Sequence, residues 1–289
     1  METAELLKKV RQIEIKARGL SRNIFAGQYH SAFKGRGMAF SEVREYQYGD
    51  DIRDIDWNVT ARYNKPFIKV FEEERELTVM LLIDASESLG FGSSKQIKRD
   101  VVAEIAATLA FSAIQNNDKI GVIFFSDKIE KFIPPKKGRK HILFIIREIL
   151  GFEPENSGTE INLALRYLNN AIKKRCTAFL ISDFIDDKDY KQSLRIANRK
   201  HDIVAIQVYD KLSTYLLPVG LMKIKDPETG NEMWIDTSSK SVRQNYANWW
   251  RERQVEMDTA FRQSSVDNIS VSTEDDYVRA LLQLFQKRK

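Results

Sequence analysis

Oxygen-bearing side chains alternate in one short segment directly after an apolar run. The segment is Asp84-Ala85-Ser86-Glu87-Ser88, so a carboxylate and two hydroxyls can converge from one loop. All three are hard oxygen donors, and Mg²⁺ prefers six oxygen ligands in near-octahedral geometry, several of them waters. The spacing therefore predicts a divalent-cation site, with Mg²⁺ as the expected ion and Mn²⁺ or Ca²⁺ as alternatives.

Two more oxygen donors are expected at the same place. Thr159 precedes a predicted helix, and Asp183 follows a predicted strand at residues 179–182. Each residue alone is typical of a helix cap or a turn. Residues that follow the strands of a parallel sheet, however, meet at one edge of that sheet. We therefore predict one metal site and assign neither catalytic residues nor an organic cofactor; its five side chains are Asp84, Ser86, Ser88, Thr159 and Asp183.

Short apolar runs and amphipathic stretches alternate from residue 77 onward. The predicted strands cover residues 79–83, 120–125, 178–181, 203–208 and 268–272. The predicted helices cover residues 95–114, 140–150, 161–173, 241–262 and 276–287, with one more before residue 203. Runs that are apolar on both faces are typical of parallel strands covered by helices on each side. The predicted fold class is α/β, a doubly wound and mostly parallel sheet flanked by helices.

The two remaining parts of the chain are less regular. Residues 1–76 are predicted to form an N-terminal extension, with an amphipathic helix at 5–18, irregular structure at 19–49 and a strand near 66–71. The main domain then covers residues 77–289. Two apolar segments flank Asp226-Pro227-Glu228-Thr229-Gly230, whose Pro and Gly indicate a turn. We therefore expect a β-hairpin insertion at about residues 211–237.

Closely spaced carboxylates at residues 50–56 offer a possible second metal site. Three arginines can pair with these acids instead, namely Arg44, Arg53 and Arg62. Trp57 and Ile55 could act as apolar anchors. We therefore favour a structural network that clamps the N-terminal region to the main domain.

Composition excludes several classes of protein. The 46 basic residues stand against 41 acidic ones with the signs interleaved, and the basic run 136–140 contains no aromatic residue, so nucleic-acid binding is not favoured. The apolar runs fall far short of the roughly 20 residues of a membrane span. A single cysteine, Cys176, excludes an internal disulfide, and we expect a cytoplasmic setting.

The five oxygen donors resemble the metal-ion-dependent adhesion site of von Willebrand factor A domains, and all five positions match. The segment 44–57, continuing to Thr60-Ala61-Arg62, resembles the signature of the bacterial DUF58 family. The resemblance implies a von Willebrand A-like fold in which the three hydroxyls bind the ion directly and the two aspartates bind it directly or through water. DUF58 proteins are often paired with MoxR-type AAA+ ATPases and are thought to act in complex assembly or chaperone-like maturation.

The resemblance implies a non-enzymatic, cation-dependent protein-binding module that takes an Asp or Glu from its partner. The ATPase would be a separate protein, because the glycines of residues 90–95 lack the spacing of a phosphate-binding loop. The alternative is a metal-dependent hydrolase, a phosphatase or nuclease, in which Asp84 and Asp183 hold a cation that activates water. No base is evident near them in the sequence, since the three histidines lie in unrelated contexts: His30, His141 and His201.

Overall fold

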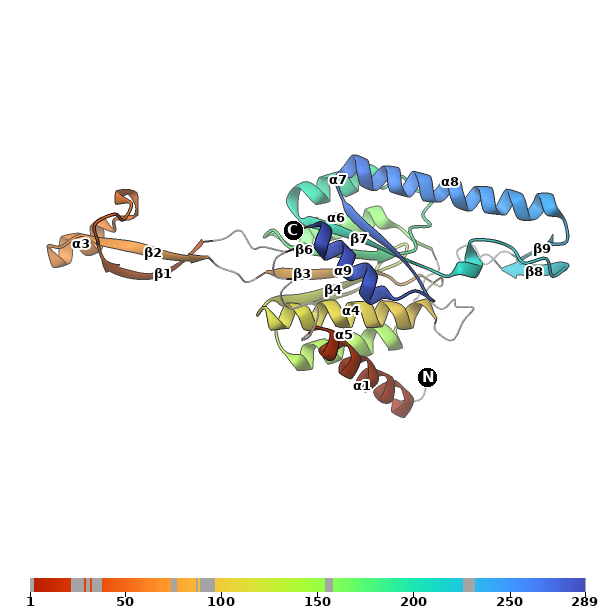
Figure 1. Cartoon of the computed structure of the whole chain (residues 1–289), viewed down its shortest axis with the longest axis horizontal. Helices are drawn as coiled ribbons and strands as arrows, with labels where there is room; N and C mark the ends of the chain where they lie inside the picture. Colours follow the sequence, from red (N-terminus) through yellow and green to blue (C-terminus); the bar gives the residue numbers. More distant parts are fainter. Residues whose placement is uncertain are drawn as a thin grey trace. The chain divides into compact units, whose positions relative to one another are not determined.

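The structure of the chain is a computed structural model (Figure 1). It describes residues 3–21, 29, 32, 38–73, 77–86, 88, 97–153, 158–225 and 232–288, so Glu87, the glycine-bearing segment 90–95 and the expected turn at 226–230 lie outside the described residues. The chain forms two compact units. The α/β unit comprises Met1–Phe33 with Leu77–Lys289, and the small unit is Lys34–Glu76.

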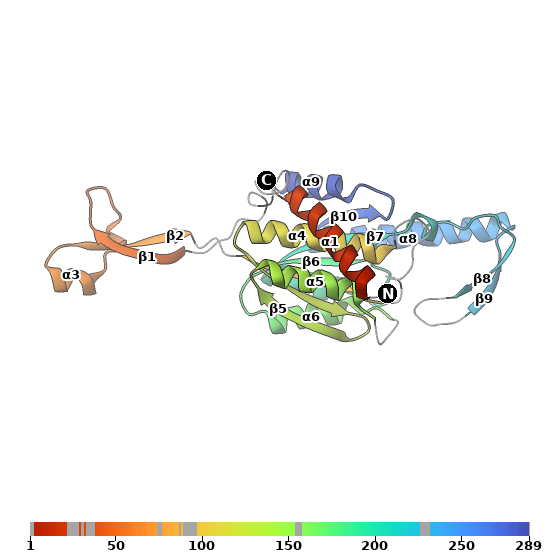
Figure 2. The same cartoon turned by 90° about the horizontal axis from the view of Figure 1, so that it is seen from below.

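A six-stranded sheet forms the centre of the α/β unit (Figures 1 and 2). The strands are β3 (Thr78–Asp84), β4 (Lys119–Phe125), β5 (Ile129–Lys136), β6 (Thr177–Ser182), β7 (Asp202–Tyr209) and β10 (Asp267–Ser272). Their order is β10-β7-β6-β3-β4-β5, and every neighbouring pair is parallel except β4 and β5. The predicted doubly wound, mostly parallel sheet is confirmed.

Helices cover both faces of this sheet. One face carries α1 (Thr3–Leu20), α4 (Lys98–Gln115), α5 (Arg139–Gly151) and α9 (Tyr277–Lys287), and the other carries α6 (Ile161–Ala171), α7 (Lys191–Lys200) and α8 (Lys240–Ser264). Side chains of β3 alternate between the two resulting cores, Leu81 toward the first and Leu82 toward the second. This arrangement confirms the prediction of helices on both faces of the sheet. Helix α1, predicted within the N-terminal extension, packs against α4 and α5.

The antiparallel strand β5 was not predicted from the sequence. It contains Pro134 and Pro135 and lies at the edge of the sheet, pairing only with β4 among the described strands. Proline cannot donate to a strand ladder, so it is confined to edge strands, bulges or strand starts. The two prolines argue against a strand in the sequence, but an edge strand such as β5 accommodates them.

The small unit contains a two-stranded antiparallel sheet, β1 (Met38–Glu45) with β2 (Phe67–Glu73), a short 3₁₀ turn at Ile52–Asp54 and helix α3 (Trp57–Tyr63). Strand β1 lies in the segment predicted to be irregular, so that prediction was wrong there. A register shift between Phe40 and Glu42 interrupts the pairing. Such a bulge breaks the alternation of apolar and polar residues by which a strand is recognised.

The acidic cluster of the small unit takes part in ion pairs. The Arg44 guanidinium donates to both carboxylate oxygens of Asp50, at 2.8 and 2.7 Å, and holds the pKa of that carboxyl below its usual value. Arg53 donates to Asp51 at 2.7 Å. The expected pairing of arginines with these acids is therefore confirmed for Arg44 and Arg53, while the clamp to the main domain stays a prediction.

The other end of the acidic cluster begins helix α3. Asp56 accepts hydrogen bonds from the amides of Asn58 and Val59, at 3.0 and 3.2 Å, and so caps the helix. The Trp57 side chain is 69% exposed, so it does not anchor the small unit from within. The seven-residue helix α3 has no buried residue, so it offers no core for this ring.

The expected hairpin is present in the α/β unit. Strands β8 (Leu221–Lys225) and β9 (Glu232–Asp236) pair antiparallel, with Leu221 opposite Asp236. Among the described residues, none of the helices combines the length and the apolar character needed to cross a bilayer.

Candidate metal centre

The point where the sheet reverses its winding lies between β3 and β6. After β3 the chain passes through α4 to β4 on one side, and after β6 it passes through α7 to β7 on the other. Connections that diverge in this way leave a crevice outside the carboxyl ends of the two strands, where α/β proteins bind ligands. Asp84 is the last residue of β3 and Asp183 follows the last residue of β6. The fold therefore places both aspartates at the end of the sheet where such ligands bind.

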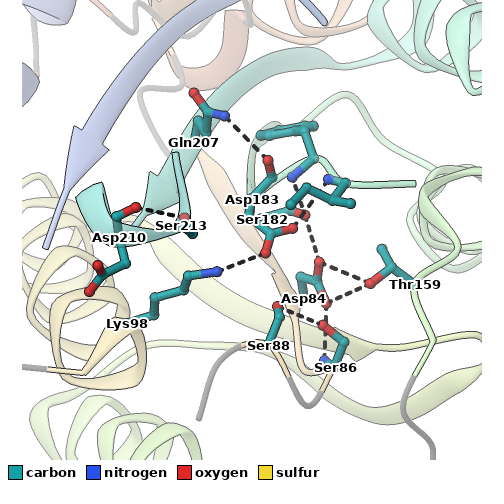
Figure 3. A network of polar contacts seen from close by, with 12 residues as sticks. Asp84, Ser86, Ser88, Lys98, Thr159, Ser182, Asp183, Gln207, Asp210 and Ser213 are labelled. Carbon is teal, nitrogen blue, oxygen red and sulfur yellow. Dashed lines mark hydrogen bonds and ion pairs between the residues drawn. The ribbon is translucent and has the colours of Figure 1, made fainter. Parts of the chain in front are cut away.

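Asp84 is the most enclosed carboxylate of the site, with 2% of its surface exposed. Its Oδ2 accepts a hydrogen bond from Ser182 Oγ at 2.6 Å, and its Oδ1 accepts one from the amide of Ser86 at 3.0 Å (Figure 3). Thr159 Oγ1 lies 3.5 Å from both carboxylate oxygens. Burial, followed by the negative charge of Asp183, raises the pKa of Asp84 to about 6. The side chain is held rigidly but in an environment that disfavours its charge.

Two serine hydroxyls from the loop after β3 lie side by side. Ser86 Oγ and Ser88 Oγ are 3.0 Å apart, with Ser86 buried and Ser88 half-buried. Neighbouring oxygens around an octahedral Mg²⁺ with ligands at 2.0 to 2.1 Å are about 2.9 Å apart. The two hydroxyls thus already have the separation of adjacent ligands.

Thr159 is brought to the site by the loop before α6. The amide of Glu160 donates to the carbonyl of Ser126, which follows β4, at 2.8 Å. The amide of Ile161 donates to Asp186 Oδ2 at 2.9 Å, and this ties the start of α6 to the loop after β6. Thr159 directly precedes these two attached residues and is buried.

Asp183 lies beside Asp84 but has a cationic partner of its own. The Lys98 ammonium, at the start of α4, donates to Asp183 Oδ2 at 2.9 Å (Figure 3). Oδ1 of Asp183 accepts from the amide of Ile185 at 3.2 Å. Its backbone carbonyl accepts from Gln207 Nε2 at 3.3 Å. The structure thus brings all five sequence-predicted residues to one end of the sheet, but it engages both carboxylate oxygens of Asp183.

The backbone after Asp183 is strained. Phe184 has φ 59°, a left-handed conformation that costs a bulky L-residue roughly 1–2 kcal/mol. Its amide donates to Ser182 Oγ at 2.9 Å, and its ring packs edge-on against Phe261 at 5.0 Å. These contacts hold the turn that presents Asp183 next to Asp84. Strain of this kind concentrates at functional sites, where the surroundings can enforce it.

The donor set fits a hard divalent cation. Hydroxyl and carboxylate oxygens suit Mg²⁺, Ca²⁺ or Mn²⁺, whereas thiolates and imidazoles select softer metals. Across the described ranges, no three His, Cys, Asp or Glu side chains gather closely enough to hold a metal. The candidate site is therefore defined by its hydroxyls, with Asp84 and Asp183 as its two acids.

Three residues of the site were missed by sequence reasoning: Lys98, Ser182 and Asp186. Ser182 had a local signal, because it is the polar end of a buried strand next to Asp183. Asp186 follows Asp183 by three residues in a loop rich in acids, so nothing local distinguishes it. Lys98 stands beside Arg99 in a helix start and is equally inconspicuous.

Asp186 should support the site indirectly, through the position of Thr159. Asp186→Ala removes the acceptor of the buried Ile161 amide, so we expect a loss of about 1–3 kcal/mol in the free energy of unfolding. Urea denaturation measures this loss. The neighbouring Asp187→Ala is the matched control, because that side chain is 81% exposed and pairs with Arg253 at the surface. Equal stability of the two variants would contradict the role given to Asp186.

The sequence of this chain matches the profile of one protein family. The profile of the family described as "Protein of unknown function DUF58" matches residues 42–256. The chain belongs to the DUF58 family. An uncharacterized protein of Mycobacterium tuberculosis is 26% identical over 293 residues, covering all of this chain and 92% of the relative. This DUF58 chain therefore aligns with that relative along its whole length.

Solved structures resemble the DUF58 chain in fold. An aerotolerance-related membrane protein from Bacteroides fragilis aligns with a TM-score of 0.50 at 14% identity, over 73% of this chain and 99% of the other. The VWA domain of SpRpn10 aligns with a TM-score of 0.43 at 12% identity, over 73% of this chain and 95% of the other.

Proposed function

We propose that this DUF58 protein is a non-enzymatic protein-binding module that depends on a divalent cation. The observation that carries the proposal is the gathering of oxygen donors at the reversal point of the sheet: Thr159 Oγ1 lies 3.5 Å from Asp84, and the paired hydroxyls of Ser86 and Ser88 follow Asp84 in the same loop. These hydroxyls would hold Mg²⁺, or Mn²⁺ or Ca²⁺, directly. Asp84 and Asp183 would bind the ion directly or through a water molecule.

A cation held mainly by hydroxyls keeps most of its charge. Neutral ligands do not compensate the ion, so a free coordination position attracts an anionic oxygen from outside the protein. An Asp or Glu side chain of a partner protein supplies such an oxygen. Binding would then require the cation and would reverse when the cation is removed.

The partner we propose is a MoxR-type AAA+ ATPase, with this chain as an adaptor in complex assembly or chaperone-like maturation in the cytoplasm. Membership of the DUF58 family supports this choice, together with the adhesion-site pattern of Asp84, Ser86, Ser88, Thr159 and Asp183. The acid offered by the ATPase would complete the coordination of the cation.

The proposal is tested by capture of the ATPase with and without cation. The tagged full chain is incubated with extract of its own host in Mg²⁺ or in EDTA, and bound AAA+ proteins are identified by mass spectrometry. We expect a MoxR-type ATPase to be retained by the wild type in Mg²⁺ only. Ser86→Ala should lose it, whereas Ser238→Ala, an exposed serine before α8, should keep it. If the ATPase is retained equally well in EDTA and by the Ser86→Ala variant, cation-dependent binding is refuted.

One observation favours the alternative of a metal-dependent hydrolase. A pKa near 6 would let Asp84 act as a general base close to neutral pH. Both of its oxygens, however, accept hydrogen bonds from the protein itself. Mg²⁺-dependent hydrolysis of p-nitrophenyl phosphate or single-stranded DNA that is lost in Asp84→Asn would support this alternative over a binding module.

A further inference from the structure

Lys98 is a buried lysine in contact with the candidate metal centre. Its side chain is 5% exposed, and its ammonium lies 2.9 Å from Asp183 Oδ2, whose side chain is 4% exposed (Figure 3). Removing both charges from water costs several kcal/mol, and an apolar pair of similar size is often as stable. Lys98 and Arg99 also place two cations at the start of α4, where the helix dipole opposes them. Stability alone does not account for this lysine.

The charge of the site gives Lys98 a role. Asp84, Asp183 and Lys98 together carry one net negative charge when both acids are ionised. A divalent cation would convert that net charge to one positive charge. Without the lysine, the two carboxylates would neutralise the cation completely. Lys98 therefore decides whether the loaded site attracts a carboxylate from outside.

Lys98 also restricts what Asp183 can do. Oδ2 of Asp183 is used by the ammonium, and Oδ1 accepts from the amide of Ile185. A carboxylate paired with an ammonium reaches a metal ion through water more readily than directly. Both oxygens of Asp84 also accept hydrogen bonds, but from the neutral Ser86 amide and Ser182 hydroxyl, so among the described contacts of Asp84 there is no cation that competes with a metal ion. The lysine thus assigns Asp183 to the outer sphere of the site.

We propose that Lys98 is a built-in counter-cation of the metal centre, which weakens cation binding and at the same time gives the loaded site the positive charge that recruits a carboxylate. The inference rests on the proposed function. It deepens that function by explaining how a site with two acids stays electropositive. It also predicts two effects of opposite sign from one substitution.

The first effect is measured with the metal alone. Lys98→Met keeps an unbranched side chain without charge, and isothermal titration of Mn²⁺ at about pH 8 is expected to show at least roughly tenfold tighter binding than the wild type. The increase in melting temperature on adding Mn²⁺ should be larger as well. Lys98→Gln, whose amide can still donate to Asp183, is measured alongside in case the methionine variant does not fold. Lys9→Met is the matched control, because Lys9 of α1 pairs at 3.0 Å with Asp100 of α4, and these side chains are 35% and 19% exposed against 5% for Lys98.

The second effect is measured with acetate as the carboxylate probe. Acetate that displaces water from bound Mn²⁺ lowers the water-proton relaxation rate. We expect this response in the wild type, and at least several-fold weaker acetate binding in Lys98→Met and Lys98→Gln. The double variant Lys98→Met with Asp183→Asn carries only the Asp84 charge, so its loaded site is again positive, and acetate binding should return.

The outcomes separate the inference from the proposed function. If the wild type binds Mn²⁺ and the neutral Lys98 variants bind Mn²⁺ and acetate equally well, Lys98 is only a structural partner and the inference is overturned. Weaker Mn²⁺ binding in those variants would overturn it as well. If the folded wild type binds no Mn²⁺, the proposed function falls and this inference falls with it.

Discussion

Replacing Ser86 with alanine is expected to lower the affinity for Mg²⁺ by at least about tenfold while leaving the fold intact, since loss of a group that only supports a ligand already costs about 10–100-fold. Ser86 Oγ is buried and lies 3.0 Å from Ser88 Oγ. The hydrogen bond from the backbone amide of residue 86 to Asp84 does not depend on the side chain, so it is kept in the variant. The variant therefore loses a ligand oxygen without losing the contact that positions the loop. Isothermal titration gives the affinity, and urea denaturation gives the free energy of unfolding.

Ser182→Ala provides the comparison, because this serine supports Asp84 instead of facing the ion. Its hydroxyl donates to Asp84 Oδ2 at 2.6 Å and accepts from the Phe184 amide at 2.9 Å. Its loss leaves buried polar atoms unpaired, so we expect about 1–3 kcal/mol lower stability together with weaker Mg²⁺ binding. If Ser86→Ala bound Mg²⁺ as tightly as the wild type, the hydroxyl pair would be a turn contact and not part of a metal site.

Strands and helices of the α/β unit could be predicted because the spacing of their apolar residues follows from which faces are buried. Strand β3, for example, lies between two apolar cores, so both of its faces are apolar and its sequence shows a continuous hydrophobic run. The patterns failed where a local feature breaks the period. Strand β1 carries a register shift between Phe40 and Glu42, and β5 carries Pro134 and Pro135.

Much of the candidate site could also be predicted, because parallel strands end at one edge. Asp84 and Asp183 were placed together by that rule alone. The partner of Asp183 could not be predicted, since Lys98 stands 85 residues earlier in the chain and only the packing of α4 against the sheet brings the two together. Asp186 is similar, because its contact with the Ile161 amide spans 25 residues. Spacing along the chain indicates the donors of a site, while the charges that tune it come from tertiary packing.

The affinity for Mg²⁺ is expected to fall as the pH drops below about 6. Burial and the charge of Asp183 raise the pKa of Asp84 to about 6, so Asp84 is protonated in the metal-free protein at lower pH. A metal ligand must be deprotonated, and cation binding then has to release this proton. The affinity should fall by up to about tenfold for each pH unit below 6 and should be constant above it. Isothermal titration in a series of buffers from about pH 5 to pH 8 measures the profile.

Asp84→Asn is the control for this profile, because it removes the titrating group. We expect the variant to bind Mg²⁺ weakly and to lose the change in affinity near pH 6.

The free energy of unfolding of the metal-free wild type should change with pH in the opposite direction and fall as the pH rises. A raised pKa means that the folded state holds the proton more tightly than the unfolded chain, so ionisation of Asp84 destabilises the metal-free fold between about pH 4 and pH 6, and fully above pH 6. Asp84→Asn should therefore be more stable than the wild type at about pH 8 without cation, and less stable relative to it when Mg²⁺ saturates the wild type. A wild-type profile that is flat between pH 5 and pH 8 would show that Asp84 does not take up a proton in this range.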